Sequence, residues 1–302
     1  MLTMSKIKLP SDRLWPRANS LFKPNLKKAD IALVGVPAHK SSISPTSAHL
    51  TPKAIREALA KYSTFSASKE IDLRGLSFTD LGDVINPDGL DGKKRVAKKL
   101  ENVLDDYQTL IALGGDNSIT FSVASSIFKD LSKVGLVTLD AHHDLRDGMS
   151  NGSPVWRLIQ AGLPGKNIVQ IGISDFANSR EYTQRAKEQG IHIISRDQLR
   201  RQSMKDAMKE AFSVLNRRVD EIYVDLDVDV CDRAAVPACP ASVPGGISAD
   251  ELRQAAFYAG ANSKVRAVDI TEIDVKKDSP DQRTIRLAAL LVLEFAAGVA
   301  SR

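Results

Sequence analysis

Residues 134–144 read VGLVTLDAHHD, an apolar run that leads directly into a cluster of aspartates and histidines. Residues 221–229, EIYVDLDVD, are similar, with aspartates alternating with apolar residues. Short apolar runs of this kind predict buried strands, and side chains two apart in extended backbone point to the same face. Carboxylates gathered on one face of a partly dry site would repel each other strongly. The two stretches therefore predict a bound multivalent cation, and with it a metalloenzyme.

Similar apolar runs alternate with helical patterns from about residue 30 to the end of the sequence. Strands are expected at 31–36, 109–113, 135–139, 168–173, 191–195, 221–224 and 265–270. Helices are expected between them, at 51–62, 92–107, 118–131, 154–162, 178–189, 203–217, 248–260 and 282–300. This alternation is typical of a parallel sheet covered by helices on both faces. We therefore expect an α/β fold, a single-domain three-layer αβα sandwich over residues 30–302 with a mainly parallel sheet of about eight strands. Residues 1–29 would be an N-terminal extension packed on it.

Composition argues against several classes of protein. No segment of the 302 residues approaches ~18 uninterrupted apolar residues, so no membrane span is expected. The first residues lack the apolar core of a signal peptide, and we expect a cytoplasmic protein. Cys231 and Cys239 do not suggest a disulfide framework, and core packing is their default role. The net charge of +5 is spread over helical segments and aromatics are only 5%, which favours a small-molecule substrate over a nucleic-acid partner.

Polar clusters follow four of the expected strands. In parallel α/β sheets ligands bind beyond the carboxyl ends of the strands, so these clusters are expected to share one site. They are residues 114–118 (GGDNS), 140–144, 225–229 and Glu272. For single residues, purely structural roles stay open. Asp116, Asn117 or Ser118 could each cap the N-terminus of a helix. Asp225 could be a hydrogen-bond partner of a metal ligand, and Glu272 could form a surface salt bridge.

The acidic clusters have a chemistry that suits particular metals. Carboxylates and one imidazole, with no Cys-x-x-Cys motif in the chain, suit an ion harder than structural zinc, such as Mn²⁺. Ni²⁺ or Co²⁺ would also accept the set, which comprises Asp140, His142, Asp144, Asp227 and Asp229. Its carboxylates would balance two divalent cations. Two such ions lower the pKa of a shared water from ~15.7 towards neutrality, which indicates a hydrolase.

The clusters also resemble, in order and spacing, the three metal motifs of the ureohydrolases, the superfamily of arginase, agmatinase and formimidoylglutamase. The matching stretches are GGDNS at 114–118, DAHHD at 140–144 and DLDVDVCD at 225–232. TPKAIR at 51–56 and DITE at 269–272 resemble further motifs of the superfamily. The resemblance covers the chain from about residue 30. It implies the arginase fold, two Mn²⁺ per chain and a homo-oligomer, either a trimer or a hexamer.

The resemblance also assigns the metal ligands. Asp140 and Asp227 would bridge two metals, Asp144 and Asn117 would complete one of them, and His142 with Asp229 the other. The superfamily usually has histidine at the position of Asn117, where asparagine offers a neutral carbonyl oxygen. Formimidoylglutamases of the bacillus type are similar here, since they also show GGDNS.

Departures from arginase bear on the substrate. Arg146 follows the second motif, where arginases have asparagine, and its guanidinium could bind a carboxylate through two hydrogen bonds. Asn151 stands in the Gly-x-Pro loop, where arginases place a proton-shuttling histidine. Both positions resemble formimidoylglutamase, which implies hydrolysis of N-formimidoyl-L-glutamate to L-glutamate and formamide in histidine degradation. Arg146 and Asn151 would then bind substrate, Glu272 would orient the amidinium, and Asp144 would relay the proton to the leaving nitrogen.

Two alternatives remain open from the sequence. Agmatinase, or another hydrolase of guanidino compounds, would share the metal motifs, but agmatine lacks a carboxylate for Arg146. A ureohydrolase-like protein that no longer catalyses would explain Asn117 and Asn151.

Overall fold

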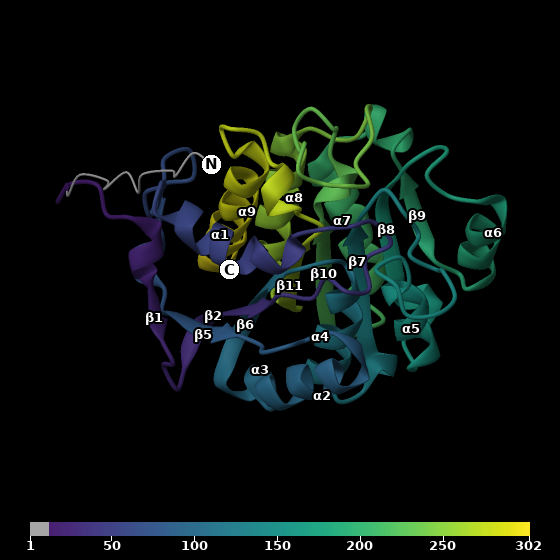
Figure 1. The fold of residues 1–302 in the computed structure, drawn as a ribbon, viewed down its shortest axis with the longest axis horizontal. Helices are drawn as coiled ribbons and strands as arrows, with labels where there is room; N and C mark the ends of the chain where they lie inside the picture. The colour runs from purple at the N-terminus through teal and green to yellow at the C-terminus, as the bar shows by residue number, and fades with distance from the viewer. Residues whose placement is uncertain (1–11) are drawn as a thin grey trace.

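A parallel sheet runs through the middle of the protein, and helices cover both of its faces (Figure 1). The computed structural model describes residues 12–302. Within these residues nine strands form one sheet, and all neighbouring strands are parallel. In spatial order the strands are β1 (Phe22–Pro24), β5 (Phe78–Asp83), β2 (Ala29–Val36), β6 (Tyr107–Gly114), β11 (Val265–Thr271), β10 (Glu221–Asp227), β7 (Val134–Leu139), β8 (Ile168–Ile173) and β9 (His192–Ser195).

The helices form two layers, each with its own apolar core against the sheet. The first core contains buried side chains of α1 (Thr51–Leu59), α7 (Met204–Leu215), α8 (Ala249–Ala261) and α9 (Arg283–Ala300). The second contains buried side chains of α2 (Gly89–Lys99), α3 (Val103–Asp106), α4 (Ser118–Ile127), α5 (Pro154–Gln160) and α6 (Arg180–Glu188). The predicted three-layer αβα sandwich with a mainly parallel sheet is thereby confirmed. No helix within residues 12–302 is long and apolar enough to cross a membrane.

The fold differs from the sequence-based expectation at its edges. Strand β5 was not predicted because only Phe78 and Thr79 of its six residues are buried, so it lacks a clear apolar run. Strand β1 lies in the segment 1–29 and pairs with β5, while residues 1–11 of that segment lie outside the described residues. The single helix expected at 92–107 is wrong. It is two helices, α2 and α3, because Asn102 between them has a left-handed backbone with φ of 56°.

Helices α8 and α9 approach each other closely through two glycines. A Cβ added at Gly260 would lie 2.0 Å from the carbonyl oxygen of Phe295, and one at Gly298 would lie 2.2 Å from that of Phe257. These contacts involve backbone, so a side chain cannot be accommodated by a rotamer change. The absence of a side chain at both positions therefore fixes the spacing of this helix pair.

We expect Gly260→Ala to lower the free energy of unfolding by about 1–3 kcal/mol, because the added methyl group overpacks the α8–α9 contact. Denaturant titration followed by circular dichroism measures the change. The matched control is Gly75→Ala, where an added Cβ meets no atom within 4 Å, and its stability should stay within about 0.5 kcal/mol of wild type. Equal stability of the two variants would contradict the close packing of α8 on α9.

Candidate metal centre

The polar clusters that follow β6, β7, β10 and β11 meet at one edge of the sheet. These four strands are neighbours in the order β6-β11-β10-β7, so their carboxyl ends lie side by side. A cavity of about 320 Å³ opens there. Its lining includes eight of the nine predicted site residues, namely Asn117, His142, Asp144, Arg146, Asn151, Asp227, Asp229 and Glu272. The ninth, Asp140, is buried and lies against His142.

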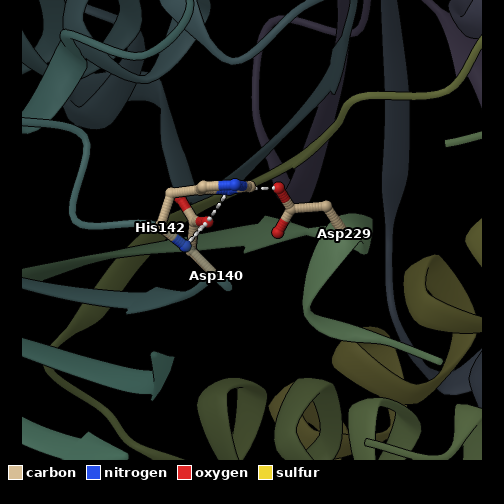
Figure 2. Close-up of side chains that lie close together, drawn as sticks. All are labelled: Asp140, His142 and Asp229. Carbon is tan, nitrogen blue, oxygen red and sulfur yellow. Dashed lines mark hydrogen bonds and ion pairs between the residues drawn. The ribbon is translucent and has the colours of Figure 1, made fainter. Parts of the chain in front are cut away.

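Asp140, His142 and Asp229 form the tightest group of possible ligands (Figure 2). One ligand atom from each lies within 4.8 Å of the others. His142 Nδ1 is 2.7 Å from Asp229 Oδ2 and 3.4 Å from Asp140 Oδ1. Asp229 Oδ1 accepts a hydrogen bond from the backbone of Ala141, and the backbone N–H of Asp229 donates to Asp227. Asp140 Oδ1 accepts from the backbone N–H of His142 at 2.6 Å. Backbone groups thus hold three of the carboxylates in place.

The pKa values of the acidic residues and of His142 show that a positive charge would be stabilised at this site. Burial and the nearby Asp229 carboxylate raise the pKa of Asp140 to about 7. Burial raises the pKa values of Asp144 and Asp227 well above the ordinary aspartate value. Burial lowers the pKa of His142, but Asp229 and Asp140 outweigh it and raise that pKa to about 12. The buried carboxylates have too little positive charge near them to balance their own charge. Such oxygen donors, together with one imidazole, suit hard divalent cations.

Asp144 reaches the cavity through a turn that follows β7. Strand β7 ends at Leu139, and Asp144 has a left-handed φ of 53°. Extended geometry therefore does not persist through 140–144, and a turn brings Asp144 to the cavity. Strain of this kind is held in place by its surroundings and is common at functional sites.

Asn117 lies at the first residue before α4, but its side chain makes no helix cap. Instead, its Nδ2 donates to Asp144 Oδ2 at 2.6 Å and to Asp140 Oδ2 at 3.4 Å. The capping contact at this end comes from Asp116, whose Oδ1 accepts from the backbone N–H of Ser118. The capping interpretation of Asn117 is wrong, and its amide belongs to the acidic site.

Glu272 follows β11 and is 4% exposed, with a left-handed φ of 66°. Its Oε1 accepts from the backbone N–H of Asn117 at 2.7 Å and from Asn151 Nδ2 at 2.9 Å. Burial and Asp116 raise the pKa of Glu272 to about 7. It pairs with no basic side chain among residues 12–302, so the surface salt-bridge alternative is wrong. Asn151 Oδ1 in turn accepts from the backbone N–H of Ile43 at 3.0 Å, which ties the Asn151 loop to the residue 41–44 loop.

Arg146 lines the same cavity but is exposed. Its backbone N–H donates to Gly152, and its guanidinium carbon lies 6.0 Å from the ring centre of Tyr182. Within residues 12–302 no carboxylate pairs with its side chain. The cavity therefore carries one free cation at its exposed side and a buried carboxylate, Glu272, elsewhere in its lining.

Several residues around the site were not predicted from the sequence. Tyr182 of α6 lines the cavity, and Thr120 of α4 contacts Asn117. Thr120 follows Asn117 by three residues, a helical spacing that could have placed it beside that side chain. Cys231 and Cys239 are both free and buried in the apolar core, as the packing interpretation predicted. Asp225 is buried but does not line the cavity.

Known proteins resemble this chain over most of its length. A model of the Arginase family matches residues 29–298. Formimidoylglutamase of Halalkalibacterium halodurans is 37% identical over 298 residues, which cover 95% of this chain and 93% of that protein. The crystal structure of formimidoylglutamase from Bacillus subtilis superimposes with a TM-score of 0.91 at 31% identity, covering 99% of this chain and 96% of that one. A structure of Trypanosoma cruzi formiminoglutamase with Mn²⁺ shares the fold, with a TM-score of 0.87 at 23% identity over 95% of this chain and 99% of that one.

Proposed function

The chain belongs to the arginase family, and on that premise we propose that it hydrolyses N-formimidoyl-L-glutamate to L-glutamate and formamide. The ureohydrolase resemblance of the sequence motifs is confirmed, and the similarity to formimidoylglutamases extends over nearly the whole chain. One observation carries the choice of substrate. The same cavity holds Glu272, a buried carboxylate, and Arg146, a cation that no carboxylate within the described residues neutralises. A molecule with an amidinium at one end and a carboxylate at the other complements both.

Two divalent cations per chain, Mn²⁺ with Ni²⁺ or Co²⁺ as alternatives, are part of this proposal. Support comes from the donor chemistry and from the Mn²⁺ of the Trypanosoma cruzi relative. The ligands would be Asn117, Asp140, His142, Asp144, Asp227 and Asp229. When bound, such a pair supplies Lewis-acid polarisation and makes water a nucleophile near neutral pH.

The chain's own side chains would bind and orient the substrate. Glu272 would pair with the cationic formimidoyl group, and its two hydrogen bonds, from Asn117 and Asn151, would hold that carboxylate in one orientation. Arg146 would bind a carboxylate of the glutamate moiety through two parallel hydrogen bonds. Substrate contacts at both ends would bring the reacting carbon into a fixed position.

The reaction adds water to the formimidoyl carbon and breaks its bond to the glutamate nitrogen, which must gain a proton. Asn151 is an unsuitable donor because a carboxamide does not titrate, and both of its polar groups are engaged with Glu272 and Ile43. Asp144, a buried carboxyl in the lining of the cavity, is the group we propose as the relay.

A product screen tests the function. The Mn²⁺-loaded protein is offered N-formimidoylglutamate, agmatine, arginine and guanidinobutyrate, and formamide, glutamate, ammonia and urea are measured. Formamide and glutamate from the first compound alone are expected. Urea from agmatine would instead identify an agmatinase, and no product from any substrate would favour the non-catalytic alternative.

We expect Arg146→Ala to raise KM for N-formimidoylglutamate by about 10- to 100-fold with little change in kcat, because it removes a charge-assisted bidentate contact remote from the reacting carbon. Steady-state kinetics on the Mn²⁺-loaded variant measure both constants. N-Butylformamidine, which has no carboxylate, serves as the control substrate, and its kcat/KM should be the same for variant and wild type. An unchanged KM for N-formimidoylglutamate would remove Arg146 from the substrate site.

We also propose that the chain acts in histidine degradation in the cytoplasm, as a homo-oligomer, a trimer or a hexamer, with residues 1–29 as an extension of the domain 30–302. The family resemblance supports the pathway and the assembly, the presence of only two cysteines supports the cytoplasm, and the family match to residues 29–298 supports the domain bounds. Light scattering should give a mass of three or six times 32.9 kDa, and a monomer would contradict the assembly.

A further inference from the structure

Both ends of the Asn117 carboxamide make hydrogen-bond contacts with buried side chains. Towards the cavity, its Nδ2 donates to Asp144 at 2.6 Å and to Asp140 at 3.4 Å. Away from the cavity, its Oδ1 contacts the hydroxyls of Thr120 at 2.9 Å and Thr271 at 3.2 Å. Both threonines are fully buried, so water does not compete for these contacts.

This orientation points the nitrogen, which is no metal ligand, at the acidic site. An amide NH2 group that donates to two carboxylates partly offsets their repulsion through the positive end of its dipole. A metal at the same place needs the oxygen, so the carboxamide must turn by about 180°, which exchanges its oxygen and nitrogen. Nδ2 would then face Thr120 and Thr271. A buried N–H without an acceptor there would be costly.

The hydroxyl of Thr120 can accept a hydrogen bond from Asn117 Nδ2 because Asp269 lies on its other side and can take the hydroxyl hydrogen. Thr120 Oγ1 is 2.9 Å from Asn117 Oδ1 and 2.8 Å from Asp269 Oδ2, but a hydroxyl has only one hydrogen to donate. When that hydrogen goes to Asp269, the oxygen of Thr120 is free to accept from Asn117 Nδ2. Tyr223 donates to the same Asp269 oxygen at 2.7 Å, which marks it as an acceptor.

We propose that Thr120, backed by Asp269, is a positioning residue that lets the Asn117 carboxamide exchange its ends, with nitrogen towards the carboxylates without metal and oxygen towards the metal when it binds. The inference rests on the proposed function only in that it takes Asn117 as a ligand of one of two divalent cations. Thr271 assists as a second hydroxyl that can either donate or accept. The Asn117 amide would then donate to the carboxylates through its nitrogen or bind the metal through its oxygen, according to which end faces the site.

The test is Mn²⁺ binding to the whole protein, followed by calorimetry and by electron paramagnetic resonance of free Mn²⁺, with no substrate present. Thr120→Val keeps the shape and removes the acceptor, and it should weaken one of the two Mn²⁺ sites by about 10- to 100-fold. Thr120→Ser keeps a hydroxyl and should bind within about threefold of wild type. Thermal unfolding of the metal-free variants checks that both are folded.

A double-variant cycle separates positioning from a general structural effect. Asn117→Asp has oxygens on both branches of its side chain, so no exchange of ends is needed. In that background Thr120→Val should change Mn²⁺ affinity by less than about threefold. An equal loss in both backgrounds, wild-type affinity for Thr120→Val, or fewer than two Mn²⁺ on the wild-type chain would each overturn the inference. Two Mn²⁺ on a wild-type protein that makes no formamide would refute the proposed function alone.

Discussion

Replacing Asp227 by asparagine is expected to lower turnover of N-formimidoylglutamate by about 1,000-fold or more and to reduce Mn²⁺ from two per chain to one or none. Asp227 is 2% exposed, and its Oδ1 already accepts from the backbone N–H of Asp229. The substitution keeps the shape and that acceptor but removes the charge of a carboxylate assigned to both ions. Loss of Lewis-acid assistance worth several kcal/mol corresponds to about three decades in rate. Metal analysis of the dialysed protein and formamide release measure the two effects.

Asp225→Asn provides a matched control on the same strand. Asp225 is the same residue type, is equally buried and lies two residues before Asp227, yet it does not line the cavity. Asp225→Asn should retain two Mn²⁺ per chain and most of its turnover. Equal loss of metal in both variants would mean that general disturbance of β10, and no specific ligand role of Asp227, explains the result.

The sequence was sufficient to predict where the site lies. Apolar runs followed by polar clusters marked the carboxyl ends of β6, β7, β10 and β11. Ligands bind at this edge in parallel α/β sheets, so the pattern alone predicted the location of the site. Sequence motifs do not contain the turn that brings Asp144 to the cavity. Its φ of 53° is unfavourable for an isolated aspartate and is imposed by the surrounding structure.

The contacts around Asn117 depend on tertiary register, which local patterns do not encode. Asp269 reaches Thr120 because β11 lies between β6 and β10, in a register that pairs Asp269 with Ala112 and Asp225. Thr120 comes from the following helix, α4. The same dependence explains why β5 was missed, since its pairing with β2 and β1 stabilises a segment whose own residues are weakly apolar.

Glu272→Gln is expected to lower kcat/KM for N-formimidoylglutamate by about 100- to 1,000-fold, because it removes the buried charge that pairs with the cationic formimidoyl group. Glutamine retains an acceptor oxygen for the Asn117 backbone N–H and for Asn151 Nδ2, so the backbone strain at φ of 66° and the loop contacts should persist. Steady-state kinetics with the Mn²⁺-loaded variant measure the loss.

Metal content distinguishes the role of Glu272 from that of a ligand. Because Glu272 lies outside the proposed ligand set, Glu272→Gln should still bind two Mn²⁺, whereas Asp227→Asn should not. Glu294→Gln, which removes a carboxylate paired with Arg253 and Lys69 outside the cavity, is the control and should keep wild-type kcat/KM. Unchanged kinetics of Glu272→Gln, or a loss restored by excess Mn²⁺, would show that this carboxylate does not bind the amidinium. With two Mn²⁺ retained and kcat/KM lost, the buried negative charge of Glu272 acts on the substrate itself.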